Sequence, residues 1–168
     1  MGLVVKIEDL LHQKTCIVGM GNYLKRDDAA GLFVVEGLKK RGVPGGVILM
    51  NVEDVPENYA YQIAELDCDN VLIVDAVQSG GEVGSVLFGR LCEMEEIAGD
   101  YSTHKLSLAL TGKILEKYHK KVWLLGIEVR DTGFGAGLSN EVNQSVRLIC
   151  DLIVDYITED QKEPVYEH

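Results

Sequence analysis

The sequence is poor in residues that mark several common protein classes. Only 16 of its 168 residues are Lys or Arg, against 27 Asp or Glu, so the formal net charge is −11. This charge argues against a nucleic-acid binder, which needs a basic face for the phosphates. No uninterrupted apolar run approaches the ~18–20 residues of a membrane-spanning helix. The four cysteines are widely spaced without a Cys-x-x-Cys pair, which argues against a thiolate zinc site or a redox motif.

Signals for targeting and for division into several units are also missing. The apolar stretch at the N-terminus is too short, and too soon interrupted by Lys6, for a signal peptide. Cys16 and Cys150 lie in apolar stretches and are expected in the core, so we expect the reducing cytoplasm. There is no internal repeat and no interdomain linker. We therefore predict one domain over residues 1–160, followed by a flexible acidic tail over 161–168.

Hydrophobic residues make up 46 % of the chain, and many of them gather in short runs. The runs do not alternate polar with apolar residues, which is typical of strands covered on both faces of a parallel sheet. A weaker fifth run follows the turn signal Ser79-Gly80-Gly81. The predicted strands are Thr15–Met20, Val47–Val52, Asn70–Val77, Ser85–Arg90 and Val122–Ile127.

Segments with helical spacing separate these runs. The spacing predicts helices over Asp28–Arg41, Leu106–His119 and Asn140–Ile157, with shorter ones over Val4–Gln13 and Asn58–Leu66. In the second of these, Leu106, Leu110, Ile114 and Leu115 are expected on the helix's apolar face. The acidic stretch 91–100 is expected as a connecting segment. Strands alternating with helices predict an α/β fold, a single three-layer domain with a mostly parallel twisted sheet and helices on both faces.

A Gly-x-Gly pair, Gly19 and Gly21, follows the first strand and suggests a dinucleotide site at first sight. The third glycine of that motif would fall at Leu24. The turn then places Asp27 and Asp28 where pyrophosphate oxygens need donors. No Gly-x-x-x-x-Gly-Lys-Ser/Thr motif occurs either. The sequence therefore argues against nucleotide binding, although that reading stays open as an alternative.

Two carboxylates call for an explanation. Asp27 is expected to cap the helix that follows, and one capping residue is enough, so Asp28 is available for a ligand. Asp75 stands inside an apolar strand, where an unpaired charge costs several kcal/mol. It therefore needs a cation, a set of donors or an open strand end. Satisfaction by backbone N–H groups of the next loop is the alternative to a functional role.

One histidine is placed differently from the other three. His104 lies at a predicted loop-to-helix junction, with Ser102 or Thr103 as the expected cap, whereas His12 and His119 have polar or basic neighbours. Asp28, Asp75 and His104 each follow or end a strand-like segment. In open α/β sheets such positions gather at the carboxyl ends of the strands. Two carboxylates and an imidazole suit a divalent ion such as Zn, Ni, Fe or Mn, with a coordination position left for water or substrate.

Four motifs in this order resemble the hydrogenase maturation endopeptidases. They are Gly19-x-Gly21-Asn22 followed by Asp27-Asp28 and Gly31; Leu72-Ile73-Val74-Asp75-Ala76; Ser102-Thr103-His104 before a Leu-rich helix; and Gly126-Ile127-Glu128 followed by Gly137-Leu138-Ser139-Asn140-Glu141-Val142. Pro56-Glu57-Asn58 is similar to the branch that matures formate-hydrogenlyase-type hydrogenases. The resemblance covers about Cys16 to Val146.

The resemblance implies a soluble α/β endopeptidase with aspartyl-protease chemistry. Its substrate would be the nickel-loaded large-subunit precursor of a nickel–iron hydrogenase, from which it removes a C-terminal peptide. The family's metal-contacting residues correspond to Asp28, Asp75 and His104, and some relatives have Glu where this chain has Asp28. The implied cofactor is nickel, supplied by the substrate or bound by the enzyme, with Zn or Cd as substitutes in the isolated protein.

Three questions stay open at this point. The metal site either verifies that nickel has been inserted or polarises the scissile carbonyl and activates water. Asp27 is a candidate base by its position, and Gly21 and Asn22 are candidates for positioning substrate or stabilising an oxyanion. A non-catalytic metal-binding chaperone or docking protein of the same fold is the alternative function. No motif for a serine or cysteine nucleophile is present.

Overall fold

The computed structural model describes residues 3–98 and 104–160 and forms a five-stranded sheet in the order β2-β1-β3-β5-β4. The neighbouring strands from β2 to β5 run parallel, and β4 runs antiparallel to β5. The strands are β1 (Thr15–Met20), β2 (Val47–Glu53), β3 (Asn70–Val77), β4 (Val86–Arg90) and β5 (Lys121–Glu128). The mostly parallel sheet is therefore confirmed, and all five strand predictions agree with it to within a residue or so at each end.

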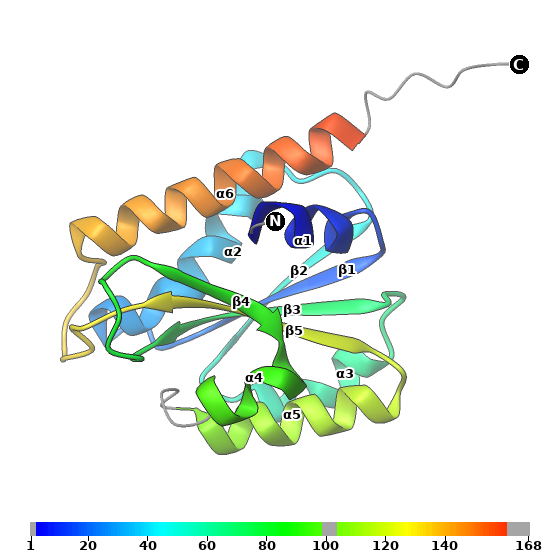
Figure 1. The fold of residues 1–168 in the computed structure, drawn as a ribbon, viewed down its shortest axis with the longest axis horizontal. Helices are drawn as coiled ribbons and strands as arrows, with labels where there is room; N and C mark the ends of the chain where they lie inside the picture. Colours follow the sequence, from blue (N-terminus) through cyan, green and yellow to red (C-terminus); the bar gives the residue numbers. More distant parts are fainter. Residues whose placement is uncertain (1–2, 99–103, 161–168) are drawn as a thin grey trace, which may run out of the picture.

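Helices cover both faces of the sheet, as predicted. α1, α2 and α6 lie on one face, and α3, α4 and α5 lie on the other (Figure 1). Two short 3-10 helices precede α2 and α3. The helices are α1 (Leu3–Leu11), η1 (Arg26–Ala29), α2 (Ala30–Arg41), η2 (Pro56–Asn58), α3 (Ala60–Ala64), α4 (Leu91–Ala98), α5 (Lys105–Lys117) and α6 (Asn140–Asp160).

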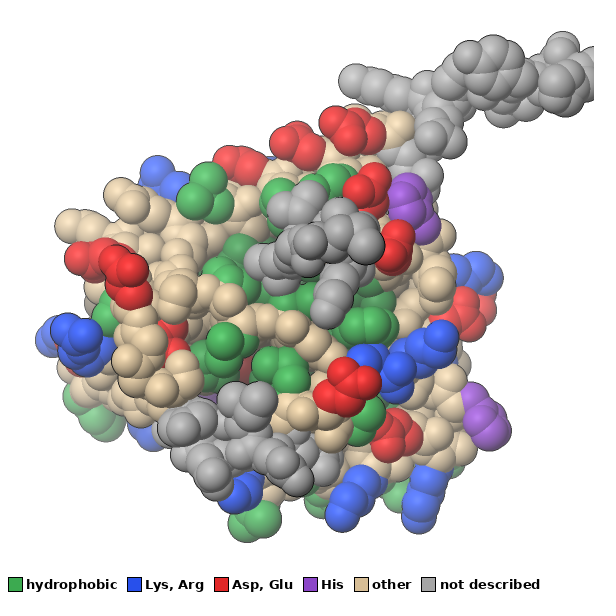
Figure 2. Space-filling view, viewed as in Figure 1, with side chains coloured by type: hydrophobic (Ala, Val, Ile, Leu, Met, Phe, Trp, Pro, Cys, Tyr) green, Lys and Arg blue, Asp and Glu red, His purple; other side chains and the backbone are tan. Residues whose placement is uncertain are grey.

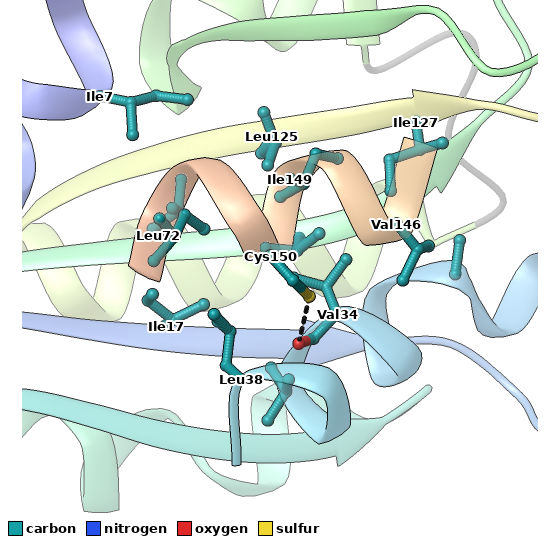
Figure 3. Close-up of a cluster of buried hydrophobic side chains, with 14 of the residues drawn as sticks. Ile7, Ile17, Val34, Leu38, Leu72, Leu125, Ile127, Val146, Ile149 and Cys150 are labelled. Carbon is teal, nitrogen blue, oxygen red and sulfur yellow. Dashed lines mark hydrogen bonds between the residues drawn. The ribbon is translucent and has the colours of Figure 1, made fainter. Parts of the chain in front are cut away.

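Every residue of the central strands β1 and β3 is buried, which explains why neither alternates polar with apolar residues. The larger of two cores lies between the sheet and α1, α2 and α6. Figure 3 shows Ile149 and Cys150 of α6 among side chains from the strands and α2, and the Cys150 thiol donates a hydrogen bond to the Val34 carbonyl at 3.4 Å. The second core lies under α3, α4 and α5 and contains the buried Cys16. The prediction that Cys16 and Cys150 are core residues is confirmed.

Three local predictions are wrong. Residues 91–98 form the helix α4 and not a connector. The segment beginning at Asp28 starts as the 3-10 turn η1, and the α-helix begins only at Ala30. On α5, Leu106 is 83 % exposed and Leu110 is 51 % exposed, whereas Leu108 and Leu115 are buried. Only Leu115 of the expected apolar face therefore lies fully in the core.

Some predictions fall outside the described residues. Ser102 and Thr103, the expected caps of α5, are among these residues, as is the predicted tail over 161–168. Within the described ranges, no helix combines the length and the apolar content needed to cross a membrane.

Candidate functional site

The structure brings Asp75 and His104 together. Asp75 lies within β3 with no exposed surface, and His104 directly precedes α5 with 14 % of its side chain exposed. His104 Nδ1 is 3.5 Å from Asp75 Oδ2, while Asp75 Oδ1 accepts a hydrogen bond from the Ala76 backbone N–H at 2.8 Å. The buried strand carboxylate thus has among its partners the Ala76 backbone N–H and an imidazole 29 residues later in the chain.

Asp28 joins this pair through the packing of η1 against β3. Asp28 is 4 % exposed, and the charges of both Asp75 and His104 act on its carboxyl group. Burial raises the pKa of Asp28 above its ordinary 3.8 most strongly, the His104 charge opposes this, and the Asp75 charge adds to it. The folded chain thus binds the proton of the Asp28 carboxyl group more tightly than the unfolded chain does. The free energy of unfolding therefore falls as the pH rises above 3.8 and Asp28 ionises.

Two glycines allow η1 to come this close. A Cβ on Gly31 would lie 2.0 Å from the Val74 carbonyl oxygen, next to Asp75 in β3. A Cβ on Gly21 would lie 2.1 Å from the Asp28 carbonyl oxygen, and Gly21 also has a φ of +145°. Side chains at either position would push Asp28 away from the strand. Gly21 therefore shapes the site through the backbone, and its predicted role in positioning substrate stays a prediction.

Carboxylates also set the protonation of His104. The hydrogen bond that His104 donates to Asp75 raises the pKa of His104 above 6.5, burial lowers it, and the charges of Asp75, Asp28 and Asp54 raise it further. Asp54 follows β2 and is a contributor that sequence reasoning missed. Its signal was available, because it also stands at the carboxyl end of a parallel strand.

The pKa of His104 gives the first testable prediction. A raised folded-state pKa means that protonated His104 stabilises the chain below pH 6.5, and this contribution is lost as the pH rises through the folded-state value. In Asp75→Asn we expect the pKa of His104 to fall toward or below 6.5, because the main cause of the rise is removed while burial remains. NMR titration of the metal-free chain measures this. An unchanged pKa in Asp75→Asn, or an equal drop in the distant variant Asp67→Asn, would contradict the pairing.

Asp27 has a structural partner that sequence reasoning missed. Its carboxylate accepts hydrogen bonds from the Ser139 backbone N–H at 2.7 Å and from the Ser139 hydroxyl at 2.8 Å. It therefore ties the loop after β1 to the start of α6, 112 residues later in the chain, and places negative charge at that helix's N-terminus. The expectation that Asp27 caps the adjacent helix is wrong. Its role as a base or a substrate-positioning group stays a prediction, with both of its oxygens engaged by Ser139.

Asn22 lies beside Asp28 at the turn after β1. Its side-chain oxygen accepts a hydrogen bond from the Leu24 backbone N–H at 2.9 Å, and its own backbone hydrogen-bonds to the Asp28 carboxylate. The side chain is half-buried and shapes the turn. Whether its amide also orients a substrate stays a prediction.

The donor chemistry at this site fits a divalent metal, since two carboxylates and one imidazole are available. Residues 3–98 and 104–160 nevertheless include no group of three His, Cys, Asp or Glu side chains arranged to hold a metal by themselves. The described part of the chain therefore brings two carboxylates and an imidazole together from three separate segments, without a complete set of ligands for a metal. A metal that brought further ligands of its own would fit this arrangement.

Comparison with known proteins identifies relatives of the whole fold. The HycI family model, described as hydrogenase maturation protease, matches residues 32–156. A protein of Methanocaldococcus jannaschii named as a putative hydrogenase maturation protease is 30 % identical over 155 residues, which is 88 % of this chain and 90 % of the relative.

Solved structures agree. The crystal structure of the NiFe hydrogenase maturation protease HycI from Thermococcus kodakarensis KOD1 has a TM-score of 0.78 and 27 % identity, and the match covers 91 % of this chain and 99 % of that one. The solution structure of the endopeptidase HycI from Escherichia coli has a TM-score of 0.74 and 23 % identity, covering 85 % and 90 %. The second match supports the fold alone.

Proposed function

The chain belongs to the hydrogenase maturation protease family and is an endopeptidase, and we propose that it removes a C-terminal peptide from the nickel-loaded precursor of a hydrogenase large subunit. The observation that supports this substrate is the group formed by Asp28, Asp75 and His104 at the carboxyl edge of the sheet. The pair of half-buried His104 and buried Asp75 at 3.5 Å, together with the electrostatically coupled Asp28, offers an imidazole and carboxylates to a metal. No observation favours the non-catalytic chaperone.

In this proposal the nickel ion is part of the substrate. The three side chains come from β3, η1 and the residue before α5 and form no metal-holding group by themselves, so the precursor supplies the remaining ligands. The family resemblance and the donor set support contact through Asp28, Asp75 and His104. The same donors would accept Zn or Cd in the isolated protein.

The chain's own residues then have distinct tasks in aspartyl-type hydrolysis. Asp75 orients the His104 imidazole through the Oδ2–Nδ1 contact, and the metal contact uses the neutral form of that imidazole. In this proposal Asp28, whose pKa is raised chiefly by burial, takes a proton from the attacking water with the carboxylate oxygen that does not contact the metal. Water adds to the scissile carbonyl carbon, the C–N bond breaks, and the proton passes to the departing amine. The four cysteines, all in the described ranges, are free thiols, and we propose the cytoplasm as the compartment.

Purified chain mixed with precursor tests the function directly. We expect a loss of precursor mass, detected by mass spectrometry, equal to one C-terminal peptide when nickel is present in the precursor. The same precursor prepared without nickel should remain uncut, since the site would lack its metal. An intact nickel-loaded precursor would contradict the endopeptidase assignment for this substrate, and equal cleavage of both precursors would contradict the role of nickel.

A further inference from the structure

The solvent-facing side of α5 is apolar where a surface helix is usually polar. Leu106 is 83 % exposed and Leu110 is 51 % exposed, and Ile114, one helical turn further, is half-buried. The spacing of four residues places these three side chains along one side of the helix. The opposite side, with Leu108 and Leu115, already packs in the core. We refer to Leu106, Leu110 and Ile114 as the α5 stripe.

Basic residues border the α5 stripe on a chain that is otherwise acidic. Lys113 and Lys117 are exposed and line a shallow depression together with Leu110, Ile114 and Glu116. The whole chain has a formal charge of −11, so this border is opposite in sign to the molecule as a whole. Figure 2 shows basic side chains gathered along the lower edge of the molecule, over α5.

The position of the α5 stripe connects it to the proposed site. His104 directly precedes α5, so Leu106 is two residues from a residue that pairs with Asp75. The 13 residues of α5 span about 20 Å at the helical rise per residue. A protein bound along the α5 stripe would therefore have the adjoining part of its own surface near His104. The surface that would bind the partner therefore lies next to the proposed site at His104.

We propose that the α5 stripe is the docking surface for the hydrogenase large-subunit precursor, which meets it with an apolar patch bordered by acidic side chains. This inference rests on the proposed function, since that function names the protein partner. Apolar side chains that are exposed in the free protein and lose water when a partner binds are typical of the centre of an interface. The bordering lysines add charge complementarity to acidic side chains of the partner. A symmetric dimer of this chain is the competing occupant. It would join two faces on which Lys113 and Lys117 outnumber Glu116, and like net charge on both faces opposes it.

The test uses Leu106→Gln/Leu110→Gln in the full chain, because glutamine keeps helix propensity and both side chains are largely exposed. Binding to purified nickel-loaded precursor is measured by biolayer interferometry, and initial cleavage rates give KM and kcat. We expect Kd and KM to rise by about tenfold or more, as for loss of central interface contacts, while kcat at saturation stays within about twofold. Lys113→Glu/Lys117→Glu should also raise Kd and weaken its dependence on salt.

Leu148→Gln is the matched control. Leu148 is 68 % exposed on α6, which covers the opposite face of the sheet, and we expect this variant to bind and cleave as the unmodified chain does. Unchanged Kd and KM in the α5 double variant, or an equal loss in Leu148→Gln, would overturn the docking surface. So would a dimer, detected by light scattering, that the α5 double variant abolishes while precursor binding persists.

Failure of the docking surface is distinguishable from failure of the function. If the unmodified chain cleaves the precursor and the α5 substitutions have no effect, the docking proposal is wrong and the endopeptidase proposal stands. If binding depends on the α5 stripe but the precursor mass does not change, the endopeptidase proposal is wrong and the docking proposal stands. Absence of both binding and cleavage overturns both.

Discussion

Asp75→Asn should reduce cleavage of the nickel-loaded precursor by about a thousandfold or more, as expected when a positioned acid–base pair is lost. Asp75 is fully buried, and its Oδ2 faces His104 Nδ1 at 3.5 Å. Asparagine keeps the size of the side chain and an oxygen for the Ala76 N–H, but it removes the negative charge that orients His104 and attracts a metal. The substitution therefore removes chemistry with little change in packing.

The experiment compares initial cleavage rates by mass spectrometry and checks the fold by circular dichroism and thermal unfolding. Asp67→Asn is the matched control, because Asp67 has 87 % of its side chain exposed and forms a surface ion pair with Lys14 at 2.6 Å. Solvent screens such an exposed pair, so we expect nearly unchanged stability and cleavage. A folded Asp75→Asn protein that cleaves at the normal rate would show that the site lies elsewhere.

Gly31→Ala should lower the free energy of unfolding by about 3 kcal/mol, at the upper end of the usual cost of overpacking a core. The added Cβ would lie 2.0 Å from the Val74 carbonyl oxygen and 2.6 Å from the Met20 carbonyl oxygen. Both neighbours are backbone atoms of central strands, which cannot move aside as a flexible side chain can. Relief requires α2 to move outward, and η1 with Asp28 would move with it.

Urea unfolding followed by circular dichroism measures the stability change, and the precursor assay reports whether Asp28 remains in place. Gly45→Ala is the matched control, since a Cβ there has no neighbour within 4 Å among the atoms outside its adjacent residues. We expect that variant to change stability by less than about 1 kcal/mol. Equal stability of Gly31→Ala and the unmodified chain would mean that α2 can shift without cost, contrary to the packing described above.

Much of the fold was predictable because burial on both faces leaves a direct mark on a strand. Thr15–Met20 and Asn70–Val77 are entirely buried, and their unbroken apolar runs indicated a parallel sheet. The hydrogenase maturation protease family was also identified from motifs in order, and the comparisons confirm it. These signals are local in the sequence, so they can be read without knowing which segments meet.

Predictions that required knowledge of neighbours did less well. The spacing of Leu106 and Leu110 resembles that of a core-facing helix, but α5 is packed through Leu108 and Leu115, and periodicity does not specify which side meets the sheet. Asp27 has the chemistry of a local helix cap, but a donor 112 residues away takes its carboxylate. When several partners could satisfy the same side chain equally well, only the folded chain shows which of them does.

The sequence by itself determined the α/β class, the central strands, the family and the acids and histidine suited to a metal-dependent cleavage. Only the tertiary structure decided that Asp75 pairs with His104 across 29 positions, that Asp28 joins them, and that the α5 stripe faces solvent. The physical reason is the distance along the chain over which each effect acts. Backbone propensity and burial pattern act over a few residues, whereas a site is made by loops from parallel strands that come together only after the sheet has formed.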